Sequence, residues 1–227
     1  MDEKVLEQLC LDMQRMKAVN SIQNIVSTTS YMFAIGEYST IVNAFFSKRE
    51  DVTAAIGNEP VAQGRDAVWT LMVENWDAYA AKTSRQLKGL YPDDPDVEGR
   101  NGLLDLRALA SPIIEVAGDG QTAKGLWLVP GTQTFCSRQV GGPEAHWYWC
   151  KLAMDFVLEN GAWKIWHFWT VPCFSAPYDK SWVEAGPGSP AAPNPYTIHD
   201  SYPHPPRPPK PYQTFADTFS YETGGTV

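Results

Sequence analysis

The sequence predicts an α+β domain in which helices precede an antiparallel sheet. Apolar residues recur at helical spacing over residues 3–46, whereas from about residue 103 the chain has the pattern of successive strands. The Asn160-Gly161 pair is typical of a tight hairpin, which joins neighbouring antiparallel strands. Helices followed by hairpin-linked strands are the element order of an α+β fold.

Two helical stretches are expected at the start of the chain, followed by a break and a short helix over residues 41–46. The second covers residues 21–35 and ends at Gly36, because glycine commonly follows the last turn of a helix. A short strand over residues 51–57 and a helix that begins near Asp66 follow, and the carboxylate suits the first turn of that helix. The apolar set of the first stretch is Val5, Leu6, Leu9, Met13 and Met16.

The later half of the chain is expected to form five strands. A Gly-Asp-Gly turn over residues 118–120 separates the early strands, and the Asn160-Gly161 hairpin separates the last two. The expected strands are residues 103–111, 112–116, 122–129, 145–159 and 163–171.

Composition changes sharply after residue 172. Most of the 18 prolines lie beyond it, and residues 205–209 have a polyproline pattern. This segment is too rich in proline to form a core, yet it carries many aromatic residues, which disordered tails usually lack. We therefore expect a domain over residues 1–172 and a C-terminal extension over 173–227 that docks on the domain or on a neighbouring subunit; a free tail is the alternative.

Charge and composition exclude several classes of partner. The net charge is −8 and no run of Lys or Arg is present, which argues against nucleic acid and anionic membranes as partners. No stretch of 18 apolar residues occurs, and the N-terminal segment has the pattern of an amphipathic helix rather than a signal peptide. The four cysteines form no CxxC pair, which argues against a zinc ribbon. A cytoplasmic protein with free thiols and an apolar small-molecule ligand is expected.

Three segments resemble motifs of the SnoaL-like, nuclear-transport-factor-two-like superfamily, in the same order and with the same spacing. They are EPVAQGRD at residues 59–66, SPIIEVAGDGQTA at residues 111–123 and ENGAWKI at residues 159–165. The resemblance covers residues 15–171 and implies a cone-shaped α+β barrel, in which N-terminal helices pack in a strongly bent antiparallel sheet around a deep cavity. The superfamily includes cofactor-free dehydratases, isomerases, polyketide cyclases and lyases, and also proteins that only bind partners.

A cofactor-free reaction needs a positioned acid and base, usually His, Asp, Glu or Tyr side chains in an apolar cavity. Strand alternation places His167 on one face with Ile165 and Trp169, and the resemblance implies that this face is the interior. His167 is therefore predicted as an acid or base, with a core histidine as the alternative. The resemblance also places Tyr31 near a catalytic tyrosine of some dehydratases, although the aspartate that follows in those proteins is replaced here by Gly36.

Arg107 and Asp105 form a second candidate pair. They lie two apart on one predicted strand and therefore share a face. Arg107 stands four residues before Ser111, where many members of the superfamily carry histidine. Because a buried arginine requires a carboxylate partner, we expect Arg107 to bind a substrate oxygen or Asp105 to act as base. A surface ion pair is the alternative.

Nine tryptophans suit a pocket with large, flat walls, since aromatic side chains line many small-molecule sites. Core and subunit interfaces are the alternative for at least half of them. No dinucleotide, P-loop, GxSxG or metal-binding pattern is present, so no cofactor and no metal are expected. The residues predicted to bind substrate are Trp76, Trp127, His146, Tyr148 and Trp169.

These features predict a cofactor-independent lyase for a hydroxylated aromatic or polycyclic compound. The reaction would be dehydration or a retro-aldol-like loss of a small fragment such as formaldehyde, as part of aromatic compound catabolism. An isomerase or cyclase with the same pocket and a non-catalytic ligand-binding or assembly module are the alternatives. A homo-oligomer, either a dimer or a trimer, is also expected.

Overall fold

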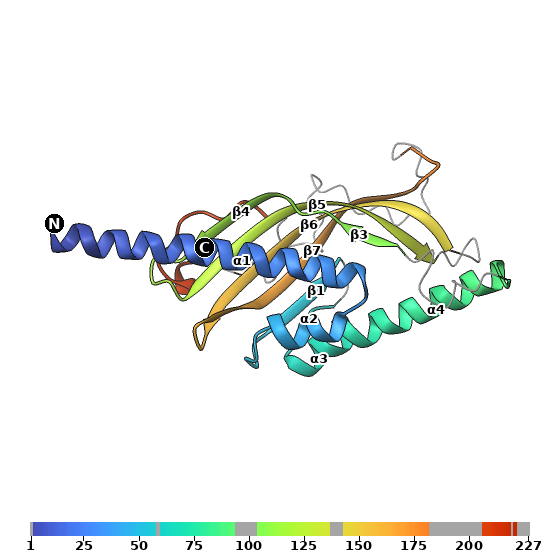
Figure 1. The fold of residues 1–227 in the computed structure, drawn as a ribbon, viewed down its shortest axis with the longest axis horizontal. Coiled ribbons are helices and arrows are strands. Elements are labelled where there is room, and N and C mark those ends of the chain that lie inside the picture. The colour runs from blue at the N-terminus through green and yellow to red at the C-terminus, as the bar shows by residue number, and fades with distance from the viewer. Residues whose placement is uncertain are drawn as a thin grey trace.

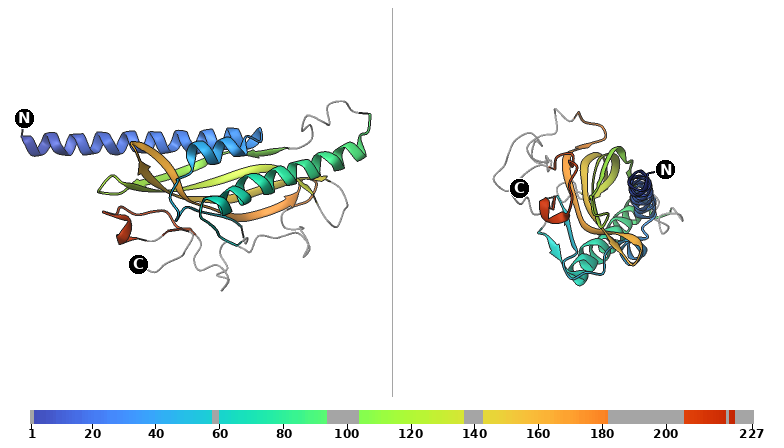
Figure 2. Two further views of the ribbon diagram at one scale, coloured as in Figure 1. Left: turned by 90° about the horizontal axis from the view of Figure 1, so that it is seen from below. Right: turned by 90° about the vertical axis from the view of Figure 1, so that its left-hand side faces the viewer.

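The computed structural model describes residues 2–57, 60–93, 104–136, 143–181, 206–218 and 220–221. Helices pack on one side of a bent, seven-stranded sheet, as Figures 1 and 2 show. The helices are α1 (Glu3–Ala34), α2 (Tyr38–Phe45), α3 (Arg65–Trp69) and α4 (Asn75–Leu90), and a π-helical turn (Thr70–Glu74) joins the last two. Within these described segments no helix is long and apolar enough to cross a bilayer.

Helix α1 is one continuous helix of 32 residues rather than two stretches. The Asp2 carboxylate accepts a hydrogen bond from the Lys4 amide at its N-terminus, which satisfies one of the free amides of the first turn. Its buried stripe begins only at Ala18 and continues through Ile22 and Val26, so that the second half of the helix packs on the sheet. The first half extends past the edge of the sheet (Figure 1).

The sheet is built on three long antiparallel strands, β5 (Thr122–Cys136), β6 (Pro143–Glu159) and β7 (Ala162–Pro177). The strand order is β2-β1-β7-β6-β5-β3, and β4 also pairs with β5. Among the strands of the described residues, β1 and β7 alone pair in parallel. The shorter strands are β1 (Thr53–Ile56), β2 (Ala62–Gln63), β3 (Asp105–Arg107) and β4 (Ala110–Val116).

The predicted α+β class, with helices packed into a strongly bent sheet, is confirmed. The sheet remains open, because its two end strands do not pair with each other. Strand β7 also continues to Pro177, past the boundary predicted at residue 172, because the equally long β6 offers it partners over its whole length. The predicted hairpin is present at Asn160 and Gly161, whose φ angles of 51° and 78° are those of a primed turn.

A β-bulge in β7 breaks the strict alternation of its side chains. Asp155 pairs with His167 and Phe156 pairs with Ile165, so Trp166 is an extra residue between the two pairs. An extra residue shifts the side chains that follow it to the opposite face, here as far as a second irregularity at Cys173. Ile165 therefore faces the helices, whereas His167 lies on the outer face. The prediction that these two side chains share the interior face is wrong for this reason.

The described C-terminal residues, 206–218 and 220–221, lie along the outer face of the sheet. The amides of Gly118 and Asp119, in the turn between β4 and β5, donate hydrogen bonds of 2.9 and 3.0 Å to the carbonyls of Tyr212 and Gln213. The Tyr212 hydroxyl lies 3.2 Å from Thr122 Oγ1. Figure 2 shows this segment in red beside the sheet.

Under this segment lies a buried ion pair. The Lys124 Nζ is 2.8 Å from Asp155 Oδ1, and the two side chains are 4% and 0% exposed. The other carboxylate oxygen is 2.8 Å from His167 Nδ1. The rings of Phe215 and Tyr221 cover the ammonium group at 4.5 and 5.1 Å. Burial lowers the pKa of Lys124, and the Asp155 carboxylate opposes that shift.

Replacement of Lys124 with methionine is expected to lower the free energy of unfolding by about 3–5 kcal/mol, because it leaves the Asp155 charge buried without its cation. The double variant K124M/D155N removes both charges and keeps an acceptor for His167, so it should be more stable than K124M alone. Urea denaturation of both variants measures the difference. A double variant as unstable as K124M would contradict this account of the pair.

Candidate functional site

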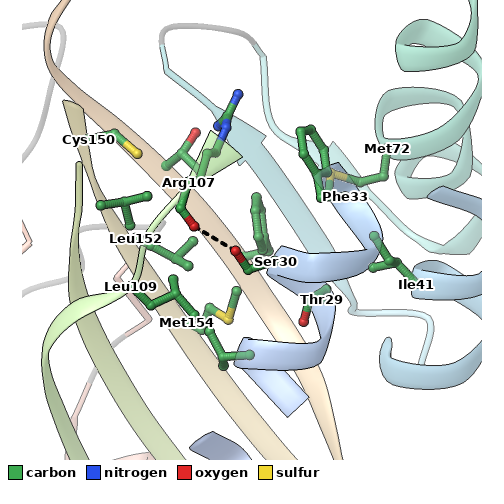
Figure 3. Close-up of a pocket in the computed structure, with 14 residues that line it drawn as sticks. Thr29, Ser30, Phe33, Ile41, Met72, Arg107, Leu109, Cys150, Leu152 and Met154 are labelled. Atoms are coloured by element: carbon green, nitrogen blue, oxygen red, sulfur yellow. Dashed lines mark hydrogen bonds between the residues drawn. The ribbon is translucent and has the colours of Figure 1, made fainter. Parts of the chain in front are cut away.

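A cavity of about 70 Å³ lies between α1 and the inner face of the sheet (Figure 3). Its walls are almost wholly apolar: Val26 and Phe33 come from α1, Leu152 and Met154 from β6, and Phe168 from β7. Among the described residues that line it, Arg107 alone carries a charge. The cavity therefore suits a small apolar group with one polar end.

Arg107 is held by Asp105 at one end of this cavity. The Arg107 Nε and Nη2 donate to the two Asp105 carboxylate oxygens at 2.6 and 3.1 Å, and the side chains are 16% and 13% exposed. Burial alone would lower the pKa of Arg107, but the charge and hydrogen bonds of Asp105 more than offset this effect. The net shift of the pKa is upward, so the guanidinium stays charged. The Ser30 hydroxyl donates to the Arg107 carbonyl at 2.6 Å, which ties α1 to β3 (Figure 3).

Aromatic rings surround the guanidinium. Its Cζ lies 5.0 Å from the centre of the Phe33 ring, 5.6 Å from that of Trp76 and 4.9 Å from that of Tyr148. These distances are within the range of cation–π attraction. Phe33 and Trp76 also meet edge to face at 4.8 Å, which fixes α1 against α4 at this point.

Gly131 lets Arg107 and Tyr148 approach each other. It pairs with Arg107 on β3 and with Tyr148 on β6, so it lies between them in the sheet. A Cβ atom at this position would lie 2.5 Å from the carbonyl oxygen of Leu106 and would force the strands apart. Glycine at this position therefore keeps β3 and β6 close to β5, and Arg107 and Tyr148 lie on these two strands.

Neutral polar groups also lie at the site. The Thr170 side chain lines the cavity, the residue is 4% exposed, and its Oγ1 has no hydrogen-bond partner among the described residues. Cys150 also lines the cavity, and burial raises the pKa of its thiol to about 11, so it is protonated near neutral pH. Burial likewise raises the pKa of Tyr148 and keeps its hydroxyl protonated.

The structure brings together four of the predicted residues. Arg107 lines one end of the cavity, Asp105 pairs with it, and the Trp76 and Tyr148 rings pack against its guanidinium. His146 lies on the same face of β6 as Tyr148, where its Nδ1 is 3.1 Å from Ser175 Oγ and its Nε2 is 3.3 Å from Glu144.

Four other predicted residues lie elsewhere. Tyr31 is 80% exposed, because it lies on the side of α1 that faces away from the sheet. His167 and Trp169 are on the outer face, beyond the bulge. Trp127 is fully buried in the core beside Phe156, and its indole N–H is 3.4 Å from Gln23 Oε1.

Sequence reasoning missed Ser30 and Thr170. Ser30 lies four residues after Val26, so the helical period alone indicates that it shares the buried face of α1. Thr170 reaches the cavity only because the bulge shifts β7, and no local signal in the sequence marks that shift. Within the described residues, no three His, Cys, Asp or Glu side chains converge as a metal site would require.

The comparisons with known proteins agree with this architecture. The profile of the SnoaL-like domain family matches residues 14–168. A proposed scytalone dehydratase of Novosphingobium aromaticivorans is similar in structure, with a TM-score of 0.52, 12% identity and coverage of 81% of this chain and 97% of that one. A hexachlorocyclohexane dehydrochlorinase of Novosphingobium barchaimii has a TM-score of 0.52 at 9% identity, with 75% and 96% covered. No curated protein sequence matches the chain.

Replacement of Thr170 with valine is expected to raise the free energy of unfolding by about 1–3 kcal/mol, because it removes a buried hydroxyl that has no partner. The matched control is Thr29→Val, which deletes a hydroxyl bonded to the Ile25 carbonyl and should not stabilise the protein. Thermal and urea denaturation measure both changes. Loss of stability in the Thr170 variant would show that its hydroxyl is already satisfied.

Proposed function

Because the chain belongs to the SnoaL-like domain family, we propose that it is a cofactor-independent lyase that binds its substrate in the cavity between α1 and the sheet. The substrate is a hydroxylated aromatic or polycyclic compound, and the reaction is a dehydration or a retro-aldol-like loss of a small fragment such as formaldehyde. The names of two similar structures, a proposed dehydratase and a dehydrochlorinase, are those of elimination reactions and support this class.

The observation that carries the proposal is the buried Arg107–Asp105 pair at the end of an apolar cavity. An ion pair in such surroundings seldom gains stability over apolar side chains of similar volume. Unlike Lys124 and Asp155, Arg107 borders a cavity, so we attribute this pair to ligand binding and catalysis rather than to folding. The guanidinium has five N–H groups and only Nε and Nη2 donate to Asp105, so donors remain for a substrate oxygen.

Both proposed reactions develop negative charge on a substrate oxygen and need a proton to move. Arg107 would stabilise the charge, since a fixed cation in a water-poor site acts strongly on a developing oxyanion. Asp105 would accept the proton from carbon or hydroxyl. Tyr148, kept protonated by burial, would donate a proton to the leaving oxygen or to the carbon released by cleavage. His146 would bind the substrate farther along the same strand.

The size of the cavity limits how the substrate binds. A cavity of about 150 Å³ holds benzene, whereas this cavity has about 70 Å³. An aromatic substrate therefore needs one wall to move, and Phe33 is suited to this because it is only partly buried. The unpaired Thr170 hydroxyl would then bind a second oxygen of the substrate within the apolar walls.

The proposed partners follow from charge and cavity. A net charge of −8 disfavours nucleic acid and anionic membrane, and the apolar walls favour a neutral organic molecule. We also propose that the chain acts as a homo-oligomer.

The Tyr148→Phe variant is expected to lower turnover by about 10²–10⁴, because a proton donor in the transition state contributes that factor. Asp105→Asn should lower turnover by a comparable factor. Tyr31→Phe is the matched control and should retain full turnover, since that ring is exposed to solvent. Turnover is measured chromatographically on a panel of hydroxylated aromatic compounds, with protein dialysed against a chelator.

The same panel separates the alternatives by product mass. A lyase releases water or a carbon fragment, whereas an isomerase leaves the mass of the substrate unchanged. Binding without any turnover would favour a non-catalytic module, and equal turnover of the Tyr148 and Tyr31 variants would overturn the proposed site.

A further inference from the structure

The first half of α1 carries an apolar stripe that nothing in the described part of the chain covers. Residues 3–17 are all exposed, and the helix projects from the body of the protein here (Figure 2). We define the seam stripe as Leu6, Leu9, Met13 and Met16, which are 51%, 49%, 55% and 73% exposed. Large apolar side chains so exposed in a row mark a contact surface.

The seam stripe faces away from the sheet. Leu9 precedes Ala18, the first buried residue of α1, by nine positions, which at about 100° per residue is half a turn round the helix. The stripe is therefore free to meet another molecule without a clash with the body of its own chain.

We propose that the seam stripe forms a parallel two-stranded coiled coil with a second copy of this chain. Its spacing of three, four and three residues is that of alternating a and d positions in a heptad repeat. Leu6 and Met13 then occupy a positions, and Leu9 and Met16 occupy d positions. The next a position is Asn20, which is exposed, and a single asparagine there aligns two parallel helices in register.

Charge complementarity selects the parallel orientation. Asp12 falls at a g position and Lys17 at the following e position. In a parallel pair, g of one helix meets the next e of the other, so Asp12 of each copy meets Lys17 of its partner. An antiparallel pair brings g to g and e to e, which places like charges together. The seam ends before Val26, where the cavity begins, so the inference does not depend on the proposed function.

The test is light scattering on the full chain over a range of protein concentrations, with Leu9→Glu as the disrupting variant. The matched control is Leu11→Glu, which changes an equally exposed leucine outside the seam. Wild type and the control should form dimers with the same dissociation constant, and Leu9→Glu should raise it by about tenfold or more, which is about 1.4 kcal/mol. A monomeric wild type, or a Leu9→Glu variant that dimerises as wild type does, overturns the proposal.

Two further variants test the orientation. Asp12→Lys should weaken the dimer, and the exchange D12K/K17D should restore it. Met13→Cys in a Cys10→Ser background should form a disulfide-linked dimer on oxidation, because a positions face each other only when the helices are parallel. Failure of the exchange to restore the dimer, or absence of the cross-link, rejects the parallel coiled coil.

Discussion

The register between β6 and β7 is the constraint on which the rest of the structure depends. The two strands pair over almost their full lengths, with Trp166 as an extra residue in β7. Before Trp166 the odd-numbered Ile165 faces the helices, and after it the even-numbered Thr170 does. Because side chains alternate strictly along a strand, this one residue decides which groups reach the cavity and which reach the outer face. It places His167 outside and Thr170 inside.

The two faces of the sheet each bury a charged pair, and each pair is covered by a different part of the chain. On the inner face, Arg107 and Asp105 lie beneath aromatic side chains of α1, α4 and β6. On the outer face, Lys124 and Asp155 lie beneath the rings of Phe215 and Tyr221 in the C-terminal segment. A buried charge without a partner is costly. The side chains that cover each pair can exclude water because each cation there has its carboxylate beside it.

The predictions from local patterns succeeded where two residues lie close together on one strand. Asp105 and Arg107 share a face by simple alternation, and the structure pairs them. Tyr148 and His146 lie together on the inner face of β6 for the same reason. The predictions failed where a longer-range effect intervenes: His167 lies past the bulge, and Tyr31 lies on the side of α1 that faces away from the sheet.

The sequence by itself determined the α+β class, the order of helices and strands, the hairpin at Asn160 and the family. These depend on local periodicity, turn chemistry and short motifs, which are properties of neighbouring residues. Only the tertiary structure decided which side chains meet in the cavity, because that depends on strand register and on helix rotation against the sheet. Such choices are set by pairing and packing between distant segments, as the meeting of Ser30, Arg107 and Thr170 round one cavity illustrates.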